Sequence, residues 1–89
     1  MKIEIRKNLS EDEVEKLGIK RWPIWEKEVS SFPWYYDEKE SCYIIEGKVT
    51  VKTSNEVVSF GAGDFVVFPA GLECEWIIDE DVKKHYNFG

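Results

Sequence analysis

Clustered positive charge, histidine and long apolar runs are all scarce in this sequence. The 89 residues include 12 Lys and Arg against 18 Asp and Glu, which gives a formal net charge of -6. No basic cluster exceeds a pair such as Lys83 and Lys84, so the chain lacks the positive surface that binding to DNA or RNA requires. No apolar run approaches the length that spans a membrane. We therefore expect neither a nucleic-acid partner nor a membrane partner.

Cysteine is also scarce, since only Cys42 and Cys74 occur. The two thiols could in principle form a disulfide. The first residues, 1–5, alternate polar and apolar side chains and do not resemble a secretion signal. Thiols stay reduced in the cytoplasm, where disulfides are rare. We therefore expect a cytoplasmic protein with two free cysteines.

Aromatic and charged residues, by contrast, are abundant. The chain has four Trp, four Tyr and five Phe, and 34% of its residues are charged. A chain of this length forms one domain and must pack its small core densely, which large aromatic side chains make possible. A high content of Glu and Lys is typical of heat-adapted proteins. We expect a single domain, residues 1–89, of thermophilic type.

Strand-forming runs separated by turn residues cover most of the chain after residue 28. One run leads from Cys42 to Gly47, and another lies between Gly63 and Pro69. Gly47 is expected to form a tight turn between two strands. The predicted strands are an edge strand at 2–6 and further strands at 29–36, 40–46, 48–53, 56–60, 65–68, 72–78 and 82–88.

One short helix is predicted before these strands, at 11–17. Ser10 and Glu13 have the spacing of a capping box at its start. The following segment, 20–28, contains Pro23, which argues against a central strand, and is expected to be extended. The pattern as a whole predicts a small barrel of short antiparallel strands.

Two segments resemble the motifs of the cupins, small β-barrels of jelly-roll type. Gly63, Pro69 and Gly71 have the spacing of the second cupin motif, and Glu40 and Gly47 match the last two positions of the first. The resemblance covers about residues 20–88, with its core motifs at about 29–88, and also rests on Trp34-x-Tyr36, Cys42 to Gly47, Cys74-x-Trp76 and Val82 to Tyr86. It is closest to the small single-domain cupins grouped with the cupin domain of ureidoglycine aminohydrolases and with ethanolamine-utilisation cupins. It implies an all-β jelly-roll barrel of two antiparallel sheets with one short N-terminal helix.

The resemblance also raises the question of a metal ion, because metal-binding cupins hold Mn, Fe or Zn with three histidines and a glutamate. Glu40 matches the glutamate, while Trp34, Tyr36 and Cys74 occupy the histidine positions. His85, the only histidine, lies outside both motifs. A metal site of Glu40, Tyr36 and Cys74 is one interpretation. We favour the other, a barrel without a tightly bound metal, in which Tyr36 is hydrogen-bonded to Glu40, because the usual cupin ions prefer imidazole and carboxylate ligands.

Strand alternation predicts an interior with aromatic walls and few polar groups, which is typical of a small-molecule pocket. The candidate ligand-binding residues are Trp34, Tyr36, Trp76, Lys84 and Tyr86, beside Glu40 and Cys74. Two indoles and a carboxylate suit a polar or cationic ligand that contains nitrogen. An inward Lys84 could instead pair with Glu40 or Glu73. We expect Trp22 and Trp25 to fill the core.

Catalysis is an open extension of this interpretation. Glu40 could serve as a general acid or base, and Cys74 as a nucleophile if a neighbouring base lowered its pKa. The resemblance implies an enzyme of nitrogen metabolism similar to ureidoglycine aminohydrolase. The alternatives are a sensing module that binds a ligand without metal, and a structural subunit with a filled barrel. Both a monomer and a homodimer are compatible with the sequence.

Overall fold

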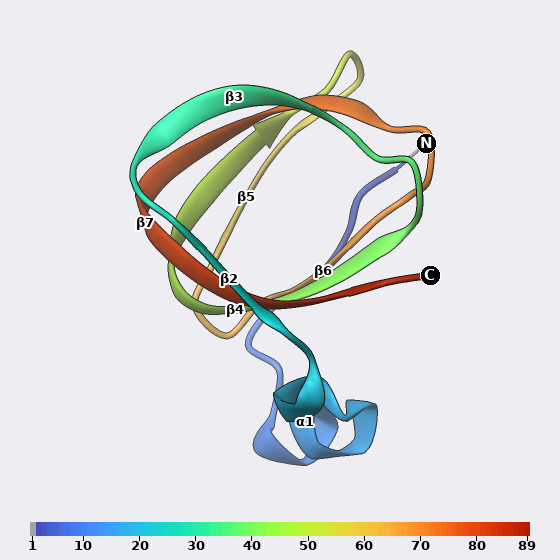
Figure 1. The fold of residues 1–89 in the computed structure, drawn as a ribbon, viewed down its shortest axis with the longest axis vertical. Helices are drawn as coiled ribbons and strands as arrows, with labels where there is room; N and C mark the ends of the chain where they lie inside the picture. The colour runs from blue at the N-terminus through green and yellow to red at the C-terminus, as the bar shows by residue number, and fades with distance from the viewer. Residues whose placement is uncertain (1) are drawn as a thin grey trace.

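Seven antiparallel strands build most of the computed structural model, which describes residues 2–89 (Figure 1). The strands are β1 (Glu4–Arg6), β2 (Ile24–Lys27), β3 (Ser30–Tyr35), β4 (Glu40–Lys52), β5 (Val57–Gly61), β6 (Phe65–Phe68) and β7 (Glu73–Phe88). One α-helix, α1 (Glu11–Leu17), and one 3-10 turn, η1 (Ile19–Arg21), lie between β1 and β2. The predicted fold class, an all-β jelly roll with one short helix, is confirmed.

The two longest strands, β4 and β7, run side by side and belong to both layers of the barrel. The first part of β4 pairs with β6 and with the last part of β7, which also pairs with β2. The second part of β4 pairs with β5 and with the first part of β7, which also pairs with β3. The strands thus curve around a common interior, with α1 outside at one end (Figure 1). Hydrogen bonds do not close the described sheet, because β1 and β2 stand at its ends.

The prediction of a tight turn at Gly47 is wrong. The chain runs through this residue as one strand, β4, and the predicted strands 72–78 and 82–88 are likewise one strand, β7. Gly47 has φ +101°, and a Cβ atom there would lie 2.8 Å from the Cα atom of Val82 and would overlap the carbonyl oxygen of Asp81. The ladder shifts register between Glu46 and Lys48. Gly47 therefore allows β4 to bend where β7 passes close to it, and the chain does not reverse direction there.

Local sequence signals at α1 and β6 are confirmed, whereas residues 20–21 of the segment that was expected to be extended belong to η1. The Ser10 side chain accepts a hydrogen bond from the backbone N–H of Glu13, whose carboxylate accepts one from the N–H of Ser10 in return. Gly18 ends α1 in the left-handed conformation. Strand β6 has the predicted bounds, 65–68. Pro23 directly precedes β2, which lies at the edge of the sheet and pairs only with β7.

The core consists of two apolar clusters. The larger one lies between the layers and includes the fully buried side chains of Val49, Val51 and Ile78. The smaller one, around Ile19 and Phe65, anchors the helical segment to the barrel. Each fully buried apolar side chain contributes about 1.5–3 kcal/mol, so these clusters hold the layers together. No helix within residues 2–89 has the length and apolar character to cross a membrane.

Candidate functional site

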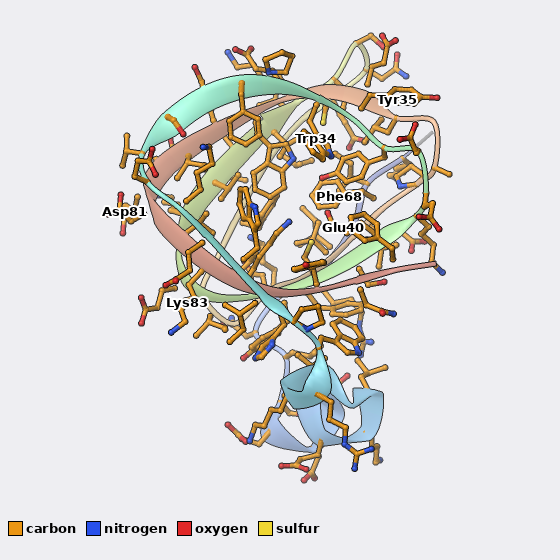
Figure 2. All side chains as sticks on the ribbon, viewed as in Figure 1. Trp34, Tyr35, Glu40, Phe68, Asp81 and Lys83 are labelled. Atoms are coloured by element: carbon orange, nitrogen blue, oxygen red, sulfur yellow. The ribbon has the colours of Figure 1, made fainter. Side chains whose placement is uncertain are left out.

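A cavity of ≈ 620 Å³ opens between strands β2, β3, β4 and β7. More than half of its lining side chains are aromatic. The lining residues are Trp25, Glu26, Lys27, Phe32, Pro33, Trp34, Tyr36, Glu40, Trp76, Lys84, Tyr86 and Phe88. Figure 2 shows Trp34 and Glu40 pointing into the space that the strands enclose, whereas Tyr35, Asp81 and Lys83 point outward. The cavity has the size and composition of a small-molecule site.

An ion pair between Glu40 and Lys84 lies in this cavity, and both residues are only 5% exposed. The Lys84 Nζ atom lies 3.4 and 3.3 Å from the two carboxylate oxygens of Glu40. In the β4–β7 ladder Glu40 is opposite Phe88, and Ile44 is opposite Lys84. Because directly opposite residues share a face and every second residue returns to it, Glu40 and Lys84 both point inward. The ion pair that the sequence suggested for an inward Lys84 is therefore present.

Two indole rings flank the same ammonium group. The Lys84 Nζ atom lies 4.9 Å from the ring centroid of Trp25 and 4.6 Å from that of Trp76. Both distances are within the range of cation–π attraction. The two rings pack edge to face, with centroids 6.1 Å apart. The chain's own lysine thus occupies the cation position at Trp76, where the sequence suggested a cationic ligand.

Tyr36 is fixed by a hydrogen bond and by stacking. Its hydroxyl oxygen accepts a hydrogen bond from Trp76 Nε1 at 3.0 Å. Its ring stacks on Phe68 with centroids 4.8 Å apart. Burial, and then the charge of Glu40, raise the pKa of Tyr36 far above its usual range, so the phenol stays protonated. Among the described residues its hydroxyl has Trp76 as a partner, and the expected hydrogen bond to Glu40 is not made.

The two cysteines differ in their relation to the cavity. Cys74 is half-buried, packs against the main core and is not among the lining residues. Burial, and then the charge of Glu40, raise its pKa to about 11, so Cys74 is a thiol at neutral pH. Cys42 is fully buried, and its Sγ atom lies 3.3 Å from Lys84 Nζ. The sequence interpretation singled out Cys74 and missed Cys42, although Cys42 is two residues from Glu40 and therefore on the same strand face.

Trp25 is the other site residue that the sequence interpretation missed. It was expected to fill the core and does pack against the main cluster, but it also lines the cavity and lies opposite Lys84 in the β2–β7 ladder. Trp22 packs against Phe65 in the smaller cluster, as expected of a core residue. The difference follows from the register of β2 with β7, which places Trp25 opposite the inward Lys84 and which no local pattern in the sequence contains.

The family follows from two comparisons. Residues 14–86 match the family model described as the EutQ-like cupin domain. The chain belongs to the EutQ-like cupin family. A crystal structure of a DUF861 family protein from Thermotoga maritima resembles this cupin over 99% of the present chain and 100% of that one. The two are 46% identical, with a TM-score of 0.94.

Longer proteins share the same barrel. A putative ethanolamine utilization protein Q from Salmonella typhimurium is 25% identical over 73% of this cupin and 53% of its own length, with a TM-score of 0.68. The EutQ protein of Clostridium difficile is 21% identical over 71% of this chain and 46% of its own length, with a TM-score of 0.65, and shows the fold alone. The present chain therefore spans about half of these two proteins. No match was found among curated proteins.

The candidate metal ligands of this cupin do not fit a divalent ion. The carboxylate of Glu40 already pairs with the Lys84 ammonium, whose positive charge repels a cation at the same oxygens. Burial, and then the charge of Glu40, raise the pKa of Tyr36 and Cys74, which disfavours the phenolate and thiolate that a metal would bind. His85 turns away, with its Nδ1 atom 2.9 Å from the carbonyl oxygen of Trp22. Within residues 2–89 no three His, Cys, Asp or Glu side chains are grouped closely enough to hold a metal.

Proposed function

We propose that this cupin binds a small polar organic molecule without net charge in the cavity between β2, β3, β4 and β7. The charge balance of the lining carries the proposal. The chain as a whole has a net charge of -6. The buried charges of the cavity lining, however, are one carboxylate, Glu40, and one ammonium, Lys84, and they pair with each other. A neutral or zwitterionic ligand enters such a cavity without leaving a buried charge unpaired.

Polar groups in the cavity specify the chemistry of the ligand. The Glu40 carboxylate accepts hydrogen bonds, and the Lys84 ammonium donates them. The Tyr36 hydroxyl accepts from Trp76 and keeps its own proton for an acceptor on the ligand. Amides, ureides and amino acids carry both donors and acceptors, and their flat groups pack well between aromatic walls. These compounds are also nitrogen-containing, as the sequence interpretation suggested.

We propose Glu40 as the residue that would convert the bound ligand in a second step. A carboxylate in contact with a bound amide or ureide is the group in this cavity that can move a proton to or from it. The similar proteins named above are described as DUF861 and EutQ proteins and not as ureidoglycine aminohydrolases, so an activity of that kind stays a prediction. The cavity of ≈ 620 Å³ favours ligand binding over the filled barrel expected of a structural subunit.

Tryptophan fluorescence and thermal shift test the proposal directly, because three tryptophans line the cavity. The protein is titrated with neutral amides and ureides, zwitterionic amino acids, cationic amines and sugar acids. We expect the first two classes to change the fluorescence and raise the melting temperature. Trp34→Ala should weaken binding at least tenfold, whereas Tyr35→Ala, a neighbour of similar exposure that points outward, should not. A preference for cationic amines, or equal affinity in the two variants, would contradict the proposal.

Turnover is measured on the same compounds. A bound ligand is incubated with the protein and followed by proton NMR, and the Glu40→Gln variant serves as the comparison. Product that forms with the wild-type protein and not with the variant identifies an enzyme. Binding without product identifies a sensing module.

A further inference from the structure

The Lys84 ammonium occupies the place beside Glu40 that a bound cation would take. Its Nζ atom lies 3.3 Å from Glu40 Oε2 and 3.3 Å from Cys42 Sγ, and it is within 5 Å of two ring centroids, at 4.6 and 4.9 Å. Carboxylate oxygens, a sulfur atom and two π faces thus surround one positive charge. Nothing in this arrangement depends on the proposed ligand, since the ammonium and the four groups around it all belong to the chain.

The ion pair offsets the energetic cost of burying the charge of Glu40. A carboxylate that is 5% exposed and stays ionised needs a counter-charge, because burying an unpaired charge costs several kcal/mol. A divalent metal or an ammonium group can supply that charge. In this chain the ammonium does so, and its stem comes from β7, the strand that pairs with the strand of Glu40.

Several neighbours hold the lysine in position. Trp76 is fixed by its hydrogen bond to Tyr36, and Trp25 lies directly opposite Lys84 in the ladder. A lysine confined in this way loses its rotamer freedom on folding, which cation–π attraction and the ion pair offset. The side chains that occupy the three histidine positions of metal-binding cupins, Trp34, Tyr36 and Cys74, leave the ammonium as the cation of the site.

We propose that Lys84 is the built-in cation of this barrel, standing in for the metal ion of metal-binding cupins, and that the site is complete without a divalent metal. The proposal is independent of which small molecule enters the cavity. It predicts that the wild-type protein does not bind divalent metals and that the charges of Glu40 and Lys84 are energetically coupled.

Metal titration is the first test. The full chain, purified without a metal-affinity tag, is treated with chelator and titrated with Co2+, Mn2+ and Zn2+ while binding and melting temperature are followed. We expect no stoichiometric binding and no thermal shift for the wild-type protein. One tightly bound metal per chain that is lost in Glu40→Gln would overturn the proposal.

A double-mutant cycle is the second test and needs no ligand or metal. Lys84→Met keeps the length of the side chain and removes its charge, and Glu40→Gln keeps the shape of its partner. We expect each single change to lower the folding equilibrium constant on the order of a hundredfold, and the double variant to recover at least tenfold of the combined loss. Lys83→Met, on the neighbouring outward residue, should change it less than about twofold. If the double variant lowers the folding equilibrium constant by the product of the two single effects, the pairing is refuted.

Discussion

The aliphatic and the aromatic parts of the barrel interior are built from the same two strands, yet they differ in what they leave open. Around Val49, Val51 and Ile78 the aliphatic side chains of β4 and β7 pack to complete burial. Further along the same strands, Glu40, Lys84 and the surrounding rings enclose a cavity of ≈ 620 Å³.

The chemistry of the side chains explains this difference. Branched aliphatic side chains interdigitate and close gaps at small cost. Rigid aromatic rings that pack edge to face around an ion pair cannot fill the remaining space without displacing the pair or breaking the Tyr36–Trp76 hydrogen bond. One interior thus contains a region that stabilises the fold and a region that holds space for a ligand.

Truncation in the aliphatic region is expected to give the largest effect on stability. Ile78→Ala removes a side chain that is 1% exposed and leaves a hole between the layers, which should lower the free energy of unfolding by about 2–5 kcal/mol. Urea denaturation monitored by circular dichroism measures this loss. Ligand affinity of the folded variant should stay within about twofold of wild type. A stability loss below about 1 kcal/mol would mean that the aliphatic region is not the stabilising one.

Truncation of Trp34 at the mouth of the cavity tests the aromatic region for comparison with the aliphatic one. Trp34 is half exposed, so Trp34→Ala should lower the free energy of unfolding by only about 1 kcal/mol. The same denaturation experiment applies, and the loss of ligand binding described above should accompany it. If Trp34→Ala cost as much stability as Ile78→Ala, the distinction between the two regions would fail.

A smaller effect is expected from the pH dependence of Cys74, which packs against the main core and does not line the cavity. Burial and the charge of Glu40 raise its pKa from 9.0 to about 11, so between these values the folded chain binds more protons here than the unfolded chain. The free energy of unfolding should therefore be unaffected below pH 9 and fall as pH rises toward 11. The contribution of this half-exposed thiol is expected to be below about 1 kcal/mol after solvent screening.

Urea titrations of wild type and Cys74→Ala across this pH range isolate that contribution. The difference between the two unfolding free energies should shrink as pH rises from 9 to 11. A difference that is constant with pH would show that Cys74 titrates alike in the folded and unfolded chain. Cys42→Ala is unsuitable as the control because Cys42 contacts Lys84.

Local patterns in the sequence predicted the elements whose ends are set by neighbouring residues. Strand β6 lies between Gly63–Asp64 and Pro69, and α1 has its capping box, so both could be placed from the sequence. Gly47 misled the prediction because positive φ occurs both at turns and at bends. Only the approach of Asp81 from a distant part of β7 decides between them, and no local pattern contains that contact.

The candidate site was predictable in its composition but not in its connections. Motif positions and alternation placed Glu40 and Tyr36 in the interior, and the cavity contains both. The positions of Trp25 and Cys42 depend on the register of β7 with β2 and β4, which joins residues far apart in sequence. For the same reason the sequence could suggest the pair of Glu40 and Lys84 and could not choose it over Glu73.

The register of β4 against β7 therefore has a consequence for how this protein matures. Because Lys84 is part of the polypeptide, its positive charge arrives with the fold, without a loading step and beyond the reach of chelators. The same dependence makes alignment of the strands essential, since a slip of one residue would turn Lys84 outward and leave Glu40 with no counter-charge. The register shifts near Gly47 are therefore part of the alignment on which the Glu40–Lys84 ion pair depends.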